Sequence, residues 1–71
     1  MEEVKDIVAK NIHELRKKNN MTQLELAEKL NYSDKTVSKW EKGENSPDIT
    51  VLVEIANIFG VSLDYLVKLS Q

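Results

Sequence analysis

The chain has 71 residues and a formal net charge of −2 at pH 7, and it contains no cysteine. This length allows one small domain, whose marginal core needs nearly every apolar residue. The absence of cysteine excludes disulfides and thiolate metal sites. No apolar run approaches the roughly 20 residues of a membrane helix, and the charged N-terminus is unlike a signal peptide. We therefore expect a single soluble, cytoplasmic domain over residues 1–71.

The charge is distributed unevenly along the chain. Residues 1–42 carry nine Lys or Arg against eight Asp or Glu, whereas residues 43–71 carry one lysine against four acidic residues. The acidic total argues against a polyanionic partner, because nucleic-acid-binding domains often have a pI above about 9. The uneven distribution nevertheless allows a basic patch on an acidic molecule.

Apolar residues at helical spacing predict a first helix near the N-terminus. The basic residues 16–18 suit the negative end of its dipole. Asn19 and Asn20 follow, and asparagine tolerates the left-handed turn that ends a helix. The stripe expected to face the core consists of Val4, Ile7, Val8, Ile12 and Leu15.

The second helix has strong start signals. Thr22 and Glu25 form a T-x-x-E capping box, and Met21 and Leu26 have the spacing of a hydrophobic staple. Asn31 is the expected end, because it can adopt a positive φ. The inner residues are expected to be Leu24, Leu26, Ala27 and Leu30.

A third helix must begin almost at once, because Ser33 is a good N-cap and Gly43 suits the position after a helix end. Two short helices joined by about three residues, with the small Ala27 allowing close approach, are typical of a helix-turn-helix. Asp48 then caps a fourth helix that Gly60 ends, and Ser62 starts a short fifth one. The inner residues expected there are Ile49, Leu52, Ile55, Ala56, Phe59, Leu63, Leu66 and Leu69. The sequence thus predicts an all-α fold, a compact bundle of five helices.

A helical wheel divides the third helix into two faces. Val37 and Trp40 point inward as core residues, and Glu41 lies at the edge of the buried arc. The outward arc can be a plain solvated surface, but its like-charged pair, Lys35 and Lys39, mildly destabilises an isolated helix. The pair also lies on the helix that enters the major groove in helix-turn-helix proteins. The arc consists of Lys35, Ser38, Lys39 and Lys42, with Asp34 at its edge.

The stretch TQLELAEKLNYSDKTVSKWEKGENSPDITVLVEIANIFGVSLDYL resembles the Cro/phage-repressor helix-turn-helix family of transcription regulators, of the xenobiotic-response-element type. The resemblance extends from about Ile7 to Leu66. It implies a lambda-repressor-like bundle that binds double-stranded DNA, has no enzymatic activity and needs no cofactor. The residues at family spacings are Gln23, Ala27, Val37, Trp40, Glu41, Gly43 and Pro47.

The same resemblance implies roles for individual residues. Gln23 would contact a phosphate and buttress the third helix, and Ser33 would donate to a phosphate. Arg16 and Glu41 would form a structural ion pair between the first and third helices. The residues expected at base edges are Asp34, Lys35 and Lys39, with Thr36 and Ser38 close by, and those along the DNA backbone are Lys42, Glu44 and Asn45.

Three positions depart from the family pattern. Asn31 stands where glycine is frequent, and Glu44 brings a negative charge into the loop that follows the DNA backbone. Asp34 could accept from a cytosine amino group, repel wrong sequences, or stabilise the helix N-terminus. We favour the last of these roles.

One such helix reaches only about four to five base pairs, so specificity needs two copies on half-sites about one turn apart. We therefore expect a transcriptional regulator, acting as a repressor, that binds an inverted repeat as a homodimer. The last helix is the candidate dimer surface through Tyr65, Val67 and Leu69, although these residues could equally close the core.

An enzyme is poorly supported by the sequence. His13, the one histidine, is expected to be an exposed surface residue beside Glu14, and no nucleophile elbow, phosphate loop, metal cluster or small-molecule site is evident. A stronger alternative keeps the fold and changes the partner, because a fold does not establish a function. In that case the chain would be an antitoxin or anti-repressor that grips another protein. The sequence leaves open the operator, the effector and whether the chain is part of a longer regulator.

Overall fold

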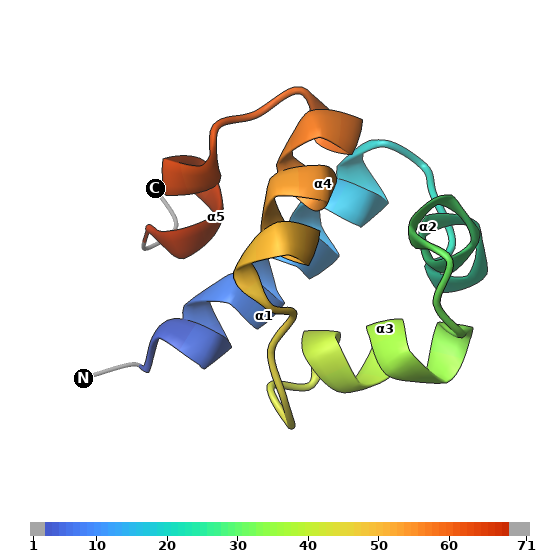
Figure 1. The fold of residues 1–71 in the computed structure, drawn as a ribbon, viewed down its shortest axis with the longest axis horizontal. Coiled ribbons are helices and arrows are strands. Elements are labelled where there is room, and N and C mark those ends of the chain that lie inside the picture. Colours follow the sequence, from blue (N-terminus) through green and yellow to red (C-terminus); the bar gives the residue numbers. More distant parts are fainter. Residues whose placement is uncertain (1–2, 69–71) are drawn as a thin grey trace.

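The computed structural model describes residues 3–68, which form five helices and no strand. Figure 1 shows the helices in chain order. Their bounds are Val4–Lys18 for α1, Gln23–Leu30 for α2, Asp34–Glu41 for α3, Ile49–Phe59 for α4 and Leu63–Val67 for α5. The predicted all-α bundle of five helices is confirmed.

Side-chain caps start four of the five helices at the predicted residues. The Thr22 hydroxyl accepts from Glu25 N at 3.0 Å, and Glu25 Oε1 accepts from Thr22 N at 2.8 Å, which completes the capping box. Three other side chains, those of Ser33, Asp48 and Ser62, each accept the backbone N–H three residues further on. These bonds satisfy donors that a helix N-terminus otherwise leaves free.

Left-handed residues follow four of the five helices, α1 to α4. Asn31 follows α2 with φ 62°, and Gly60 follows α4 with φ 68°. Asn20, after α1, has φ 55°. At Gly43 glycine is required twice over, because φ is 73° and a Cβ would lie 2.7 Å from the Asp6 carboxylate. The α3–α4 loop therefore passes tightly against the first turns of α1.

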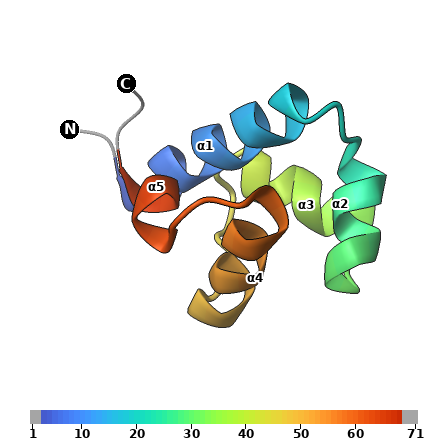
Figure 2. The same cartoon turned by 90° about the horizontal axis from the view of Figure 1, so that it is seen from above.

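The helices enclose a single core, with α2 and α3 at one end of the molecule and α5 against α1 at the other (Figures 1 and 2). Tyr32, in the turn between α2 and α3, packs edge-on against Trp40 with ring centroids 5.3 Å apart. Met21, Phe59 and Leu63 pack against the core from its border. The core consists of Val8, Ile12, Leu15, Leu26, Ala27, Leu30, Val37, Trp40, Val51, Leu52, Ile55, Ala56 and Leu66.

Three residues expected in the core are exposed instead. Val4 is 60% exposed, Leu24 52% and Ile49 62%. Leu24 lies roughly 100° around α2 from the middle of the buried arc formed by Leu26, Ala27 and Leu30. Val4 and Ile49 are the first residues of their helices, at ends where no neighbouring helix covers them. Leu69 lies outside the described residues.

A buried polar side chain joins α1 to α5. Asn11 is on the inner face of α1, and its amide donates to the carbonyls of Tyr65, Leu66 and Lys68 at 3.2, 2.9 and 2.8 Å. The first two carbonyls belong to the last turn of α5 and the third to Lys68, the residue after it, and a helix leaves acceptors without partners at such an end. Asn11 thus acts as a C-terminal cap supplied from another helix.

Candidate nucleic-acid interface

The turn between α2 and α3 is tightly closed. Tyr32 N donates to Ala27 O at 2.9 Å, and Ala27 itself is fully buried where the two helices approach. Ser33 then caps α3, and its hydroxyl oxygen lies 3.0 Å from that of Thr36. Since one of these hydroxyls donates to the other, one hydroxyl hydrogen stays free for an outside acceptor. The N-terminus of α3 is therefore both fixed and able to donate.

The faces of α3 agree with the wheel. Val37 and Trp40 are buried, while Lys35, Lys39 and Lys42 are exposed. Within residues 3–68 none of these three lysines takes part in an ion pair. Asp34 is exposed in the first turn, Thr36 and Ser38 are half-buried, and Glu44 and Asn45 are exposed in the following loop. We call the exposed side chains of Lys35, Lys39 and Lys42 the lysine face.

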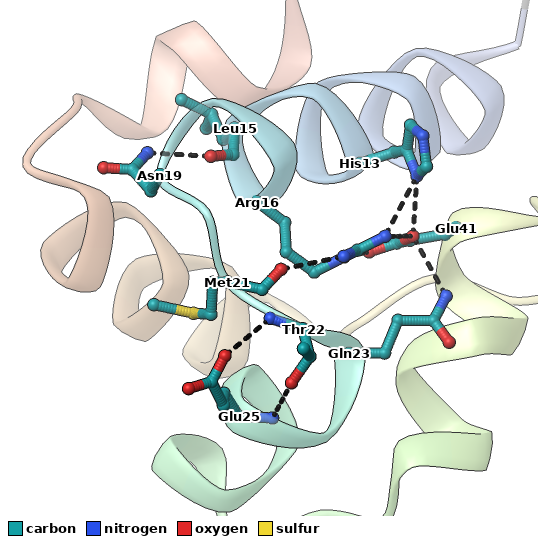
Figure 3. A network of polar contacts seen from close by, with 9 residues as sticks. All are labelled: His13, Leu15, Arg16, Asn19, Met21, Thr22, Gln23, Glu25 and Glu41. Carbon is teal, nitrogen blue, oxygen red and sulfur yellow. Dashed lines mark hydrogen bonds and ion pairs between the residues drawn. The ribbon is translucent and has the colours of Figure 1, made fainter.

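Glu41, in the last turn of α3, receives donors from two other helices (Figure 3). Arg16 of α1 binds both carboxylate oxygens, with Nε 2.7 Å from Oε2 and Nη2 3.0 Å from Oε1. Gln23 of α2 donates its Nε2 to Oε1 at 3.1 Å. His13 of α1 brings its Nδ1 within 2.8 Å of the same oxygen. We call these four residues the Glu41 cluster, and it ties the end of α3 to both α1 and α2.

The cluster holds a buried charge pair in a satisfied environment. Burial raises the pKa of Glu41, but the hydrogen bonds from Arg16, His13 and Gln23 outweigh it and lower the pKa below the ordinary 4.5. The hydrogen bond to Glu41 raises the pKa of Arg16. Arg16 also donates to Met21 O at 2.8 Å, and no buried side-chain nitrogen or oxygen of residues 3–68 lacks a partner. Both groups are therefore ionised at neutral pH.

Sequence reasoning missed two of these polar contacts. His13 is 50% exposed along its side chain, as expected for a surface residue, but it also binds Glu41. Asn11 was not singled out, although it lies within the apolar stripe of α1, between Val8 and Leu15 at helical spacing. A polar residue at such a position indicates a buried hydrogen bond, so that signal was present in the sequence. For His13 the sequence holds no comparable signal.

Gln23 lies on a concave surface between the end of α1 and the start of α2. The hollow has a volume of about 670 Å³, and its lining includes Arg16, Lys17, Thr22, Gln23 and the exposed Leu24. One hydrogen of the Gln23 amide nitrogen is used by Glu41, which leaves its second hydrogen free. The structure therefore presents a donor and basic side chains together at the start of α2.

Two negative findings concern the described residues. In residues 3–68 no helix combines the length and the apolar composition that crossing a membrane requires. The same part of the chain holds no group of three or more His, Cys, Asp or Glu side chains that could bind a metal ion.

Comparison with known proteins identifies the class. The family model described as "Helix-turn-helix" matches residues 12–66, so the chain belongs to the helix-turn-helix family, as the resemblance predicted. The HTH-type transcriptional regulator ImmR of Bacillus subtilis is 39% identical over 59 residues, which cover 83% of this chain and 46% of ImmR. The chain spans about half the length of the curated relatives it matches first.

Two solved structures are similar to the chain. The P22 c2 repressor in complex with a synthetic operator has a TM-score of 0.80 and 30% identity, with 86% of this chain and 92% of that chain covered. Hydroxypropylphosphonic acid epoxidase from S. wedmorenis has a TM-score of 0.84 and 29% identity, with 92% of this chain but 35% of the enzyme covered. The likeness to the enzyme concerns a helix-turn-helix-like part of it and transfers no activity. The family and its relatives are transcription regulators, which supports our expectation that the chain is not an enzyme.

Proposed function

We propose that this chain binds double-stranded DNA sequence-specifically with α3 in the major groove, as the DNA-binding part of a transcriptional repressor. The observation that carries the proposal is the lysine face. Lys35 and Lys39 of α3 and Lys42, the residue that caps its end, are exposed and form no ion pair within residues 3–68. The opposite face of α3 is fixed by Val37, Trp40 and the Glu41 cluster. A rigid helix with an exposed donor face is what major-groove recognition needs.

The two expected phosphate contacts lie at opposite ends of α3. Ser33 precedes the helix, and Gln23 is bonded to Glu41 in its last turn. Eight residues of helix separate these points by about 12 Å, which is also roughly the width of the major groove. We infer that the Thr36 hydroxyl donates to that of Ser33, which leaves the Ser33 hydrogen free. The free donors of Ser33 and Gln23 then bind phosphates on the two sides of the groove and fix the register of α3.

The remaining site residues take their roles from this placement. Lys35 and Lys39 donate to guanine O6 and N7, with Thr36 and Ser38 beside them, and each good base contact is worth about 1–3 kcal/mol of discrimination. Lys42 and Asn45 follow the DNA backbone. Asp34 stabilises the N-terminus of α3 through the helix dipole, and Glu44 weakens phosphate binding by like charge.

A homodimer on an inverted repeat completes the proposal. The chain addresses too few base pairs alone, and α5 offers two exposed large side chains, Tyr65 and Val67, for a second copy. The structure of P22 c2 repressor with its operator shows that a closely similar fold is compatible with operator binding by that protein. We place the protein in the cytoplasm, where its DNA would be.

The first prediction concerns the lysine face. Selection from a random duplex library should enrich an inverted repeat, and K35A/K39A should bind that duplex at least about thirtyfold more weakly, because two base contacts of about 1–3 kcal/mol each are lost. The affinity of the wild-type protein should fall steeply with salt, since phosphate contacts release counterions. The melting temperature of the double variant should stay within a few degrees of wild type, because both side chains point outward.

The matched control is K5A/K10A, which removes the same charge from exposed positions of α1. It should bind the selected duplex within about threefold of wild type. If both double variants lost the same affinity for the duplex, the lysine face would contribute only nonspecific electrostatic attraction. Enrichment of a single half-site would contradict the homodimer, and no enrichment at all would favour the protein-binding alternative.

A further inference from the structure

Glu41 has a third donor residue besides Arg16 and Gln23. Its Oε1 is contacted by Arg16 Nη2, Gln23 Nε2 and His13 Nδ1, whereas Oε2 accepts from Arg16 Nε alone. Arg16 and Gln23 were expected at their positions from the family resemblance. His13 was not, yet its Nδ1 makes one of the shortest contacts to Glu41, at 2.8 Å.

The surroundings of His13 decide which ring nitrogen carries the proton. Nδ1 faces two groups, Oε1 of Glu41 at 2.8 Å and Nη2 of Arg16 at 3.3 Å. If Nδ1 accepted from Arg16, its lone pair would point toward a carboxylate oxygen at hydrogen-bond distance, which is repulsive. If Nδ1 carries a hydrogen, it donates to the carboxylate, and a hydrogen bond to a charged acceptor is among the stronger ones. The geometry therefore favours the Nδ1–H form.

We propose that His13 is a positioning residue for the DNA-reading helix, and that its Nδ1–H bond to Glu41 holds the end of α3 against α1. This inference rests on the proposed DNA-binding function. His13 and Gln23 bind the same oxygen from different helices, so the two bonds together set the position of Glu41 between α1 and α2. Glu41 is the last residue of α3, Lys35 and Lys39 lie on the same helix, and Lys42 is the capping residue directly after it. A shift at Glu41 therefore moves the lysines relative to the phosphate donors.

The charges around His13 allow this role in both protonation states. Glu41 from α3 attracts the imidazolium and Arg16 from α1 repels it, while α2 contributes only the neutral Gln23 to the cluster. Lys10 and Lys17 lie one turn away on α1. A ring with hydrogen on Nδ1 donates to Glu41 whether or not Nε2 also carries a hydrogen.

The second prediction tests the ring itself and needs no DNA. NMR correlation of the two ring nitrogens of His13 at pH 8 should show hydrogen on Nδ1 and a bare Nε2. Donation from Nδ1–H to the Glu41 carboxylate selects this form, since the hydrogen bond of one ring nitrogen decides which nitrogen carries the hydrogen. Hydrogen on Nε2 in the neutral ring would overturn the inference, whatever the DNA measurements show.

The same prediction extends to the affinity for DNA, measured on the duplex that the wild-type protein enriches in the selection. H13A should weaken that binding about three- to tenfold, the equivalent of one net hydrogen bond. H13N should restore most of it, because its amide nitrogen reaches about as far as Nδ1 and donates likewise. Both variants are measured at a temperature where circular dichroism shows full folding.

A purely structural role predicts a different pattern. H13A would then lower the melting temperature but leave the affinity of the folded protein unchanged, and this result would overturn the inference. Failure of H13N to bind better than H13A would do the same. The ring-nitrogen measurement separates the two proposals, because it can succeed even if no duplex is ever enriched.

Discussion

At the scale of single residues, Glu41 concentrates most of the polar chemistry of the fold. Its side chain is 4% exposed, and a buried charge without partners would destabilise the protein strongly. The sequence pairs it with Arg16 through a family resemblance. The structure adds Gln23 and His13 to the same carboxylate. One residue therefore connects three helices, and its ionisation links their packing to pH.

The third prediction concerns this pH dependence. Because the pKa of Glu41 is lowered in the folded state, its contribution to stability is fully present above about pH 4.5 and is lost as pH falls through the lowered pKa. E41Q should therefore be about 1–3 kcal/mol less stable than wild type at pH 7, as expected for lost bonds to a charged group. The difference should shrink as pH falls below 4.5 and through the lowered pKa of Glu41. Urea unfolding of both proteins from pH 7 to pH 3 measures it, and a constant difference would contradict the assignment.

At the scale of helices, nearby residues fix most helix ends, whereas a long-range contact fixes the end of α5. The capping side chains and the left-handed residues act within about four positions of a helix end, so their effects can be predicted from the sequence. The end of α5 is different. Its last carbonyls are bonded by Asn11, 54 to 57 residues away along the chain. A helix of five residues is too short to be stable alone, so α5 depends on this contact and on Leu66.

The fourth prediction is that N11A loosens α5. Three carbonyls lose their donor inside a partly buried site, and unsatisfied polar groups cost about 1–3 kcal/mol. Hydrogen exchange of the α5 amides should accelerate more than that of the α3 amides. The matched control is N57A, which changes the same residue type at an exposed position of α4 and should leave exchange in α5 unchanged. Equal exchange in N11A and wild type would show that the cap is dispensable.

At the scale of the whole molecule, the small core leaves little stability to lose. Domains of this kind are stable by about 5–15 kcal/mol in total, so one large core substitution removes a sizeable share. The buried apolar residues come from all five helices, and no helix has a core of its own. Unfolding of residues 3–68 is therefore expected to be cooperative.

The fifth prediction compares two leucines of α2. Leu26 is fully buried and Leu24 is 52% exposed. L26A should cost about 2–5 kcal/mol, the range for a leucine removed from a core, whereas L24A should cost less than about 1 kcal/mol. The urea midpoints of the two variants are compared at one pH. Both variants replace a leucine of α2 by alanine, so only the burial of the residue differs. A loss of stability in L24A as large as in L26A would contradict the exposed position of Leu24.

Local and periodic features of the sequence determined the five helices, their caps and the lysine face of α3. These features depend on neighbours within one or two turns, so spacing and residue type suffice to find them. The family and its DNA-binding implication also came from the sequence, because the residues that carry the resemblance lie at fixed positions. Only the tertiary structure decided that Val4, Leu24 and Ile49 are exposed, since helical spacing does not say where a neighbouring helix ends.

The tertiary structure alone also brought His13 to Glu41, 28 residues apart, and Asn11 to the end of α5. Such contacts depend on the relative placement of whole helices, which is set by the packing of all the core side chains together. The periodicity of one helix does not predict where the other helices lie relative to it. The sequence therefore determined that α3 exposes its lysines. The packing of the helices decided which side chains hold α3 in position.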